Sequence, residues 1–320
     1  MQVPDLADVF AARQVLSRYL SPTPLLRSLV LSERFGCDLW VKYENCSPIR
    51  SFKARGGIYR LGTLLETFAG VATASTGNHG QGIALGGKTF DRKSVVYVPE
   101  GANPTKVEAI RALGADLRIA GNTLTESNHL ARAAAEAENL LYVEDGEDPD
   151  VMIGCATIGL ELLEQAPNMQ DLIVPVGGGN LIAACALVME RAAPTVRITG
   201  VQSSAAPAVH DALLARDVSV VASCETFAGG LATSFAGPFT FPFLQSGVEH
   251  IALVSDDALI AAAIEMVRAT GHLPEGAGAA PYAAIASAPE RYAGRKVVLV
   301  LSGSNAEPII WSRLTGTSPA

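Results

Sequence analysis

The sequence predicts an α/β protein built on two parallel sheets, from three observations. Short apolar runs alternate with helical patterns between Val71 and Val143, and the same alternation returns from Asp171 to Leu301. Glycine occurs 30 times among 320 residues, which indicates backbone that must approach something closely. A chain of this length exceeds the usual size of one core, so we expect one large or two smaller domains.

The N-terminal part is expected to form two helices and one strand before the first alternation begins. Residues 4–19 carry apolar side chains near helical spacing, and Pro22 and Pro24 would end that helix. Residues 39–43 alternate like a strand, and a helical pattern follows Lys53.

The first alternation is expected to fold as a small four-stranded unit. Its strands are predicted at residues 71–74, 94–98, 116–120 and 140–143, with a helix in each gap. The acidic connection from Asp145 to Asp150 marks the return to a larger domain. The predicted boundaries are therefore 71–144 for the small domain, and 1–70 with 145–320 for the large one.

The second alternation supplies the sheet of the large domain. Its strands are predicted at residues 171–176, 196–201 and 295–301, and its helices at 181–191, 205–215 and 256–270. Residues 226–243 are rich in Gly, Pro and Phe and have no clear period, which is typical of an irregular segment near a ligand.

Composition excludes several classes of partner. The net charge is −8 with no basic stripe, which argues against nucleic acid, and no apolar run reaches the roughly 18 residues of a membrane span. The five cysteines are scattered, without a Cys-x-x-Cys pair, which argues against a disulfide framework or a zinc site. We expect a cytoplasmic protein with a small-molecule substrate.

The stretch Ser51-Phe52-Lys53-Ala54-Arg55-Gly56-Gly57 carries the strongest chemical signal. A lysine held in a cleft can lose its proton on desolvation and become a nucleophilic amine. The biological aldehyde that a lysine holds as a Schiff base is pyridoxal 5'-phosphate (PLP). By itself the motif is weak, because a lysine beside Arg-Gly is more often a surface residue at a turn.

A second candidate site is the glycine run Gly177 to Asn180, which follows a predicted strand. Converging N–H groups and the start of the next helix would form a phosphate cradle, whereas a tight turn is the plain alternative. A dinucleotide fits less well, because Ile182 stands where its fingerprint needs a third glycine and no acidic residue ends the next strand.

Two further loops are predicted to stand at the carboxyl ends of strands, where open α/β sheets bind ligands. Ser75, Thr76, Asn78 and His79 concentrate donors at a helix start, which suits a carboxylate, although capping alone would explain them. In Ser302-Gly303-Ser304-Asn305, the hydroxyl of Ser302 could bond a ring nitrogen, although a turn is the simpler interpretation.

Together these pieces resemble the fold-type II PLP enzymes, the tryptophan synthase β superfamily, and most of all its serine/threonine dehydratase and serine racemase branch. The matching motifs, with Thr23-Pro24-Leu25, stand in the family's order over nearly the whole chain. The resemblance implies two parallel-sheet domains with the cofactor in the cleft between them. Residues 1–70 and 145–320 would form the cofactor-binding domain, and 71–144 a mobile substrate-clamping domain.

The resemblance also implies a role for each motif. Lys53 would be the Schiff-base lysine and the base at the substrate α-carbon, with Phe52 near the ring. The ring hydroxyl would bond Asn78, and Ser302 would bond the pyridine nitrogen. Ser75, Thr76, Asn78 and His79 would surround the substrate carboxylate. Gly177, Gly178, Gly179 and Asn180 would hold the phosphate.

The expected reaction is β-elimination of a 3-hydroxy amino acid such as L-threonine or L-serine, giving a 2-oxo acid and ammonia. Racemisation stays open, because Thr76 stands where racemases carry a catalytic serine and its hydroxyl could protonate the opposite face. A β-replacement synthase is less expected, since that branch usually has threonine at the position of His79. A binding protein without turnover is the alternative of a different class.

Three departures from the family pattern stand out. Ile49-Arg50 replaces the usual Thr-Gly before Ser-Phe-Lys, which suggests a reshaped pocket; Arg50 could bind an acidic substrate side chain or simply be solvated. The acidic metal ligands of racemase-like members are replaced by Gln202 and Ala208, so we expect no metal site there. No regulatory domain is expected after Ser302. A homodimer is expected by resemblance only.

Overall fold

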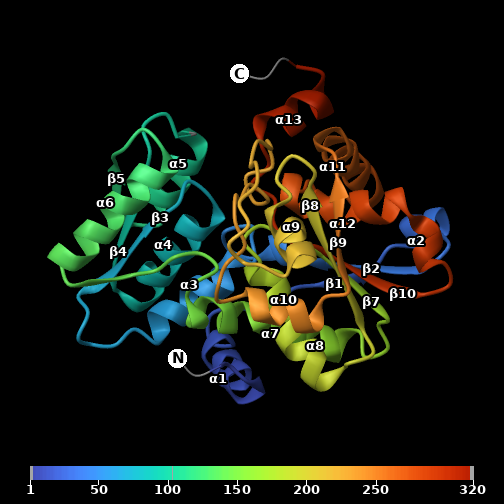
Figure 1. Ribbon diagram of the computed structural model, residues 1–320, viewed down its shortest axis with the longest axis horizontal. Helices are drawn as coiled ribbons and strands as arrows, with labels where there is room; N and C mark the ends of the chain where they lie inside the picture. The colour runs from blue at the N-terminus through green and yellow to red at the C-terminus, as the bar shows by residue number, and fades with distance from the viewer. Residues whose placement is uncertain (1–2, 103, 318–320) are drawn as a thin grey trace. The chain divides into compact units, whose positions relative to one another are not determined.

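The computed structural model describes residues 3–102 and 104–317, which belong to two compact units (Figure 1). One unit contains residues 1–21 and 53–157, and the other contains residues 22–52 and 158–320. Each unit has its own sheet flanked by helices. The predicted fold class, α/β with two parallel-sheet parts, is confirmed, whereas a mobile part at 71–144 stays a prediction.

The sheet of the first unit has four parallel strands in the order β5-β4-β3-β6. The strands are β3 (Gly70–Ala74), β4 (Lys93–Val98), β5 (Asp116–Ile119) and β6 (Leu140–Tyr142). These are the four predicted strands. Consecutive residues of β4 pack on opposite faces: Val95 joins Ala131 of one core cluster, and Val96 joins Ala84 and Ile110 of another. Helices therefore cover both faces, as parallel sheets require.

The helices of the first unit are α1 (Leu6–Leu16), α3 (Lys53–Gly62), α4 (Asn78–Phe90), α5 (Pro104–Ala112) and α6 (Leu124–Ala137). Local signals fix several of their ends. Asp5 caps α1 in a reciprocal capping box with Asp8, and the Thr123 hydroxyl accepts a hydrogen bond from the Glu126 N–H at the start of α6. Helix α7 (Pro149–Gln165) begins in this unit and runs on into the second part of the chain.

The sheet of the second unit has six strands in the order β1-β2-β10-β7-β8-β9. They are β1 (Leu25–Arg27), β2 (Asp38–Tyr43), β7 (Asp171–Pro175), β8 (Arg197–Ser203), β9 (His250–Val254) and β10 (Lys296–Leu301). All neighbours are parallel except the edge strand β1, which runs antiparallel to β2. The sequence did not predict β1 or β9.

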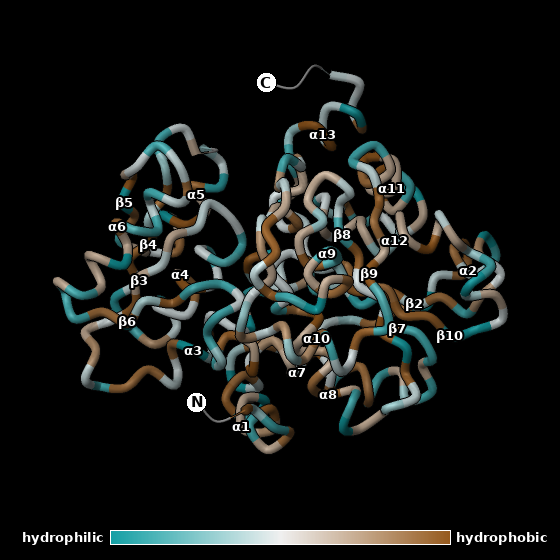
Figure 2. Tube along the Cα trace, viewed as in Figure 1, coloured by the Kyte–Doolittle hydropathy of each residue, from teal (hydrophilic) through white to brown (hydrophobic). Residues whose placement is uncertain are grey.

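The helices of the second unit are α2 (Leu29–Phe35), α8 (Asn180–Ala192), α9 (Ala208–Ala215), α10 (Phe241–Gly247), α11 (Asp256–Thr270), α12 (Gly276–Ser287) and α13 (Pro308–Thr315), with short 3-10 turns at Glu44–Cys46 and Pro289–Tyr292. The hydrophobic stretches of Figure 2 follow buried elements such as β10. Among the described residues, no helix is both long and apolar enough to cross a membrane.

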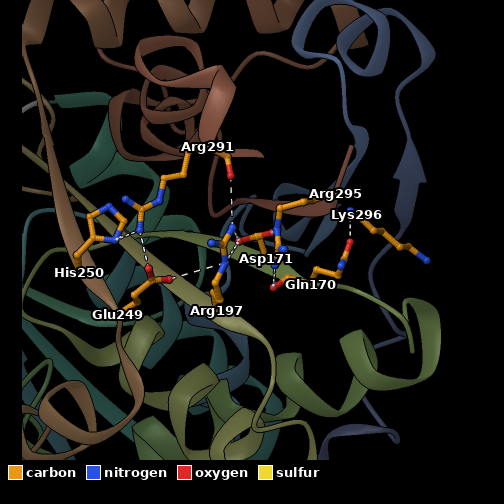
Figure 3. Close-up of polar contacts among 8 residues, drawn as sticks. All are labelled: Gln170, Asp171, Arg197, Glu249, His250, Arg291, Arg295 and Lys296. Carbon is orange, nitrogen blue, oxygen red and sulfur yellow. Dashed lines mark hydrogen bonds and ion pairs between the residues drawn. The ribbon is translucent and has the colours of Figure 1, made fainter. Parts of the chain in front are cut away.

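Charged side chains close the amino-terminal edge of this second sheet (Figure 3). Asp171 begins β7 with its side chain 2% exposed, and it pairs with Arg197 at 2.6 Å and with Arg295 at 2.5 Å. Arg291 bonds both Glu249 at 2.7 Å and the Nδ1 of His250 at 3.2 Å. These charged side chains therefore pair with one another at the end of the sheet where β7, β8, β9 and β10 begin.

Candidate active site

Backbone contacts fix the residue just before Lys53. The N–H of Phe52 donates to the carbonyl of Ser302 at 3.0 Å, and Ser51 forms an antiparallel bridge with Gly303. Phe52, Ser51 and Ser302 are all buried. Since Lys53 follows Phe52 directly, the contact with the end of β10 fixes where the backbone of Lys53 begins.

Two more contacts hold the preceding turn. The N–H of Ser304 donates to the carbonyl of Arg50 at 2.9 Å, and the side-chain amide of Asn305 donates to the carbonyl of Ile49 at 3.0 Å. Arg50 has a φ of 55°, in the left-handed region that favours glycine, and its side chain is exposed. The unusual pair Ile49-Arg50 therefore keeps a turn that is held tightly by its backbone.

The glycine run after β7 leaves room for a ligand at the start of α8. A Cβ at Gly177 would come within 2.6 Å of the Gly230 carbonyl, whereas a Cβ at Gly178 would meet nothing within 4 Å. Gly179 has a φ of 103° and caps α8 without a side-chain hydrogen bond. The N-cap of α8 therefore supplies no side-chain hydrogen bond to the start of the helix, and a helix start of this kind favours an anion.

The three loops of this unit lie at adjacent strand ends. The sheet order places β2, β10 and β7 side by side and parallel. The turn before Lys53, the Ser302 loop and the Gly177–Asn180 run follow these strands, so all three stand at one edge of the sheet, where open α/β sheets bind ligands. The sequence predicted this position for two of them and did not recognise that the lysine turn also follows a parallel strand.

In the first unit, Lys53 begins α3 against the backbone of α4. A Cβ at Gly82 would lie 2.5 Å from the Lys53 carbonyl oxygen. A Cβ at Gly57 would lie 2.0 Å from the Gly82 carbonyl, and one at Gly86 would lie 2.3 Å from the Gly57 carbonyl. Only glycine allows two helices to approach this closely, so these residues set the position of Lys53 relative to α4.

The predicted carboxylate-binding residues gather at the start of α4. Gly77 is its N-cap and supplies no side-chain hydrogen bond, while the Ser75 hydroxyl accepts from the Gly77 N–H at 3.2 Å. Ser75, Thr76 and Asn78 are partly exposed and His79 is buried. The positive end of α4 is thus accessible beside hydroxyl and amide groups, which suits a carboxylate.

A carboxylate contacts the predicted Schiff-base lysine. The Nζ of Lys53 forms an ion pair with Oδ2 of Asp145, whose side chain is 43% exposed against 11% for Lys53. Burial lowers the pKa of His79, whose Nε2 lies 3.4 Å from the Val143 carbonyl. The structure therefore brings Lys53 together with His79 and Asp145.

The predicted site residues thus fall into two sets, joined by the peptide bond between Phe52 and Lys53. One set is Lys53 with residues 75–79; the other is Phe52 with residues 177–180 and Ser302. Sequence reasoning missed Asp145, which it treated only as part of an acidic connection. It also missed Glu275, a buried residue whose carboxylate lies against the α-carbon of Gly303.

The positions considered for a metal have other roles. The Gln202 side chain accepts a hydrogen bond from the His210 N–H at 2.9 Å, and Ala208 begins α9. In the described parts of the chain, no three His, Cys, Asp or Glu side chains gather as metal ligands would.

Comparisons with known proteins agree with this geometry. Residues 16–303 match the family of pyridoxal-phosphate dependent enzymes. The L-threonine ammonia-lyase of Geobacter sulfurreducens is 37% identical over 292 residues, 91% of this chain and 73% of the relative. The crystal structure of the T.th. threonine deaminase is 34% identical and superposes with a TM-score of 0.90, over 95% of this chain and 99% of that one. Maize serine racemase is 25% identical with a TM-score of 0.92, over 98% of both chains. The chain belongs to the family of pyridoxal-phosphate dependent enzymes.

Proposed function

We propose that the protein is a lyase that removes water and then ammonia from a 3-hydroxy amino acid, L-threonine or L-serine, to give a 2-oxo acid. The observation that carries the proposal is the position of Lys53, whose backbone packs against α4 in the first unit, where α4 begins with hydroxyl and amide groups that suit a carboxylate. The names of the threonine ammonia-lyase and threonine deaminase relatives support this choice of reaction.

The residues fit the cofactor that the family uses. Gly178 has open space where a side chain would project, and the uncapped start of α8 supplies N–H donors, as a phosphate dianion needs. Lys53 is the amine for the cofactor aldehyde. Ser302, whose backbone carbonyl accepts a hydrogen bond from the Phe52 N–H, is buried and supplies a hydroxyl. We propose that these residues, with Asn78, hold PLP.

When bound, PLP withdraws electrons from the substrate α-carbon and so makes its proton acidic. We propose that residues 75–79 and the N–H groups of α4 bind the substrate carboxylate and that the amine of Lys53 takes the α-proton. The protonated Lys53 then gives that proton to the leaving 3-hydroxyl, which departs as water. The released enamine tautomerises and is hydrolysed in water to the 2-oxo acid and ammonia.

Racemisation is the second candidate, favoured by the partly exposed hydroxyl of Thr76 at the start of α4 and by the likeness to maize serine racemase. In that reaction the same proton leaves the α-carbon, and a donor on the other face returns one. The two reactions differ only in the fate of the substrate after Lys53 has acted.

One assay separates the two candidates. Purified enzyme with PLP is incubated with L-threonine, L-serine and a panel of other amino acids, and 2-oxo acid, ammonia and D-serine are measured together. We expect 2-oxo acid and ammonia in equal amounts from L-threonine or L-serine. D-serine without pyruvate would instead identify a racemase.

The role of Lys53 has its own test. Lys53→Ala should lose the cofactor adduct that borohydride traps and lose about 10³-fold or more in turnover, because nucleophile and base are removed together. Mass spectrometry of the reduced protein locates the adduct. An adduct on another lysine, or unchanged turnover by Lys53→Ala, would contradict the assignment.

Two finer parts of the proposal concern assembly and location. We propose a homodimer in the cytoplasm. Light scattering of the purified holoenzyme gives the mass, and a monomer at micromolar concentration would contradict the dimer.

A further inference from the structure

One charged contact of the site has no role in the reaction as proposed so far. Asp145 follows β6 and the buried residue Val143, and its Oδ2 contacts the Nζ of Lys53. Both residues lie in the first unit, where the close packing of α3 on α4 fixes the backbone of Lys53 through Gly82. A carboxylate is therefore in contact with the nitrogen atom that forms and breaks bonds.

Two titratable groups close to this pair, His79 and Cys155, are neutral near pH 7. Burial lowers the pKa of His79 of α4, and burial raises the pKa of the Cys155 thiol of α7 to about 12. Lys53 and Asp145 both act electrostatically on these two groups. Glu144 also acts on His79, and Arg55 of α3 acts on Cys155. Asp145 forms an ion pair with Lys53 and is negatively charged.

We propose that Asp145 is a positioning residue that makes Lys53 a stronger base, an inference that rests on the proposed elimination. In the proton-transfer step the Cα–H bond of the substrate breaks, its electron pair stays on carbon, and an N–H bond forms at Nζ of Lys53. The amine becomes an ammonium, and an adjacent carboxylate stabilises that charge. The same proton later leaves with the 3-hydroxyl as water, so Asp145 itself gains and loses no proton.

The effect is expected to be moderate because water reaches Asp145, whose side chain is 43% exposed. A direct ion pair of this kind should raise kcat by about 10- to 100-fold, less than a fully buried pair would. The contact is with Lys53 and not with the substrate, so KM should change little.

The test compares Asp145→Asn with Asp145→Glu, and with Glu147→Gln as a matched control from the same acidic connection. The pKa of Glu147 is raised by burial and by Glu144, and Lys53 is not among the groups that act on it. We expect Asp145→Asn to lower kcat about 10- to 100-fold, to enlarge the isotope effect of α-deuterated substrate, and to keep one cofactor per chain. Asp145→Glu should recover most of the loss, and Glu147→Gln should match wild type.

A second readout needs no turnover. The protein is stripped of cofactor, PLP is added over a pH series, and attachment to Lys53 is trapped with borohydride. Because only the neutral amine attacks an aldehyde, attachment by Asp145→Asn should reach its half-maximal rate at a lower pH than wild type. If L-threonine and L-serine give no product but this shift appears, the proposed reaction is wrong and the role of Asp145 stands.

Three results would overturn the proposal. These are wild-type kcat and isotope effect in Asp145→Asn, an unchanged pH dependence of attachment, or a loss of cofactor and folding that Asp145→Glu does not restore. The last result would assign Asp145 a structural role only.

Discussion

Arg50 adopts a backbone conformation that costs energy for any residue with a Cβ. Its φ of 55° is left-handed, and it is one of four such non-glycine residues among those described. Asp91 and Arg216 end helices, where this conformation is common, but Arg50 lies in the turn before Lys53. The hydrogen bond from Ser304 to its carbonyl holds it there. The strain is thus located three residues before Lys53.

Replacing this arginine by glycine should therefore stabilise the protein. The free energy of unfolding of Arg50→Gly should exceed that of Arg50→Ala by about 1 kcal/mol. Only glycine removes the energetic cost of placing a residue with a Cβ in the left-handed region. Both variants lose the same side chain, so alanine is the matched control. Urea denaturation of the two variants measures the difference. Equal stability would show that the turn relaxes without cost.

Site residues that stand in a distinctive local motif could be predicted from the sequence. Contacts between residues far apart in the sequence could not. The motifs around Lys53, Asn78 and Gly177 were recognisable because each combines small residues with donors at a strand end. Asp145 gave no such signal, because it stands among other acidic residues and meets Lys53 only after folding. Asp145 is recognised as a site residue by its contact with Lys53 and by no sequence motif.

Between elements, the packing of α3 on α4 is the contact on which Lys53 depends most. Gly82→Ala should cost about 2–3 kcal/mol of unfolding free energy, since its Cβ would collide with the Lys53 carbonyl and backbone cannot move aside cheaply. It should also reduce PLP content, because Lys53 would shift. Thermal melting and cofactor absorbance measure the two effects.

Gly62→Ala in α3 is the control for this packing. A Cβ there would meet only the Phe90 ring, at 2.8 Å, and a side chain can turn aside. We expect this variant to keep its PLP and to lose little stability. Equal losses of stability and of PLP in both variants would mean that the close packing of α4 against Lys53 does not determine cofactor binding.

Two helices that the sequence did not predict, α12 and α7, are buried along most of their length. Helix α12 is Gly- and Ala-rich, contains Pro281, and has buried residues from Gly276 to Ile285, so it shows no amphipathic period. Helix α7 is buried along most of its length, and for this reason it also shows no amphipathic period. By contrast, α6 and α11 have exposed faces and were predicted to within a few residues. A helical period of apolar residues arises where one face of a helix is exposed to water. A helix that is buried on all sides shows no such period.

At the scale of the molecule, the alternation of strands and helices was sufficient to predict two parallel sheets. The edge strand β1 was not predicted because its three residues lie outside both alternations of strands and helices. The pairing of β2 with β10 joins residues 22–52 to the same unit as 158–320, and both ranges lie within the predicted large domain of 1–70 and 145–320. Pairing between strands that are far apart in the sequence is determined by the tertiary structure and not by local sequence.

Acid should weaken the sheet of the second unit through His250. Burial, with the nearby Arg291, lowers the pKa of His250 in the folded protein, and its neutral Nδ1 lies 3.2 Å from the Arg291 guanidinium (Figure 3). The unfolded chain then binds a proton more readily than the folded one. Stability should therefore fall as pH drops through about 6.5, the unfolded value for histidine.

Asparagine at this position keeps an acceptor without a titrating ring. His250→Asn should lose less stability than wild type between pH 7.5 and pH 5.5, as measured by urea denaturation at each pH. His129→Asn, on the exposed side of α6, is the control and should follow wild type. An identical slope in all three proteins would exclude His250 as the source.

The pairing of β2 with β10 has a consequence for synthesis on the ribosome. Strand β2 is made early, yet about 250 residues must follow before β10, its parallel partner, has been synthesised. At ordinary elongation speed this wait is on the order of 10–50 s. The four strands of the other sheet all emerge during that interval. The nascent chain must therefore carry β2 without its β10 partner, just upstream of Lys53, and we expect it to become competent for vitamin B6 only when translation is nearly complete.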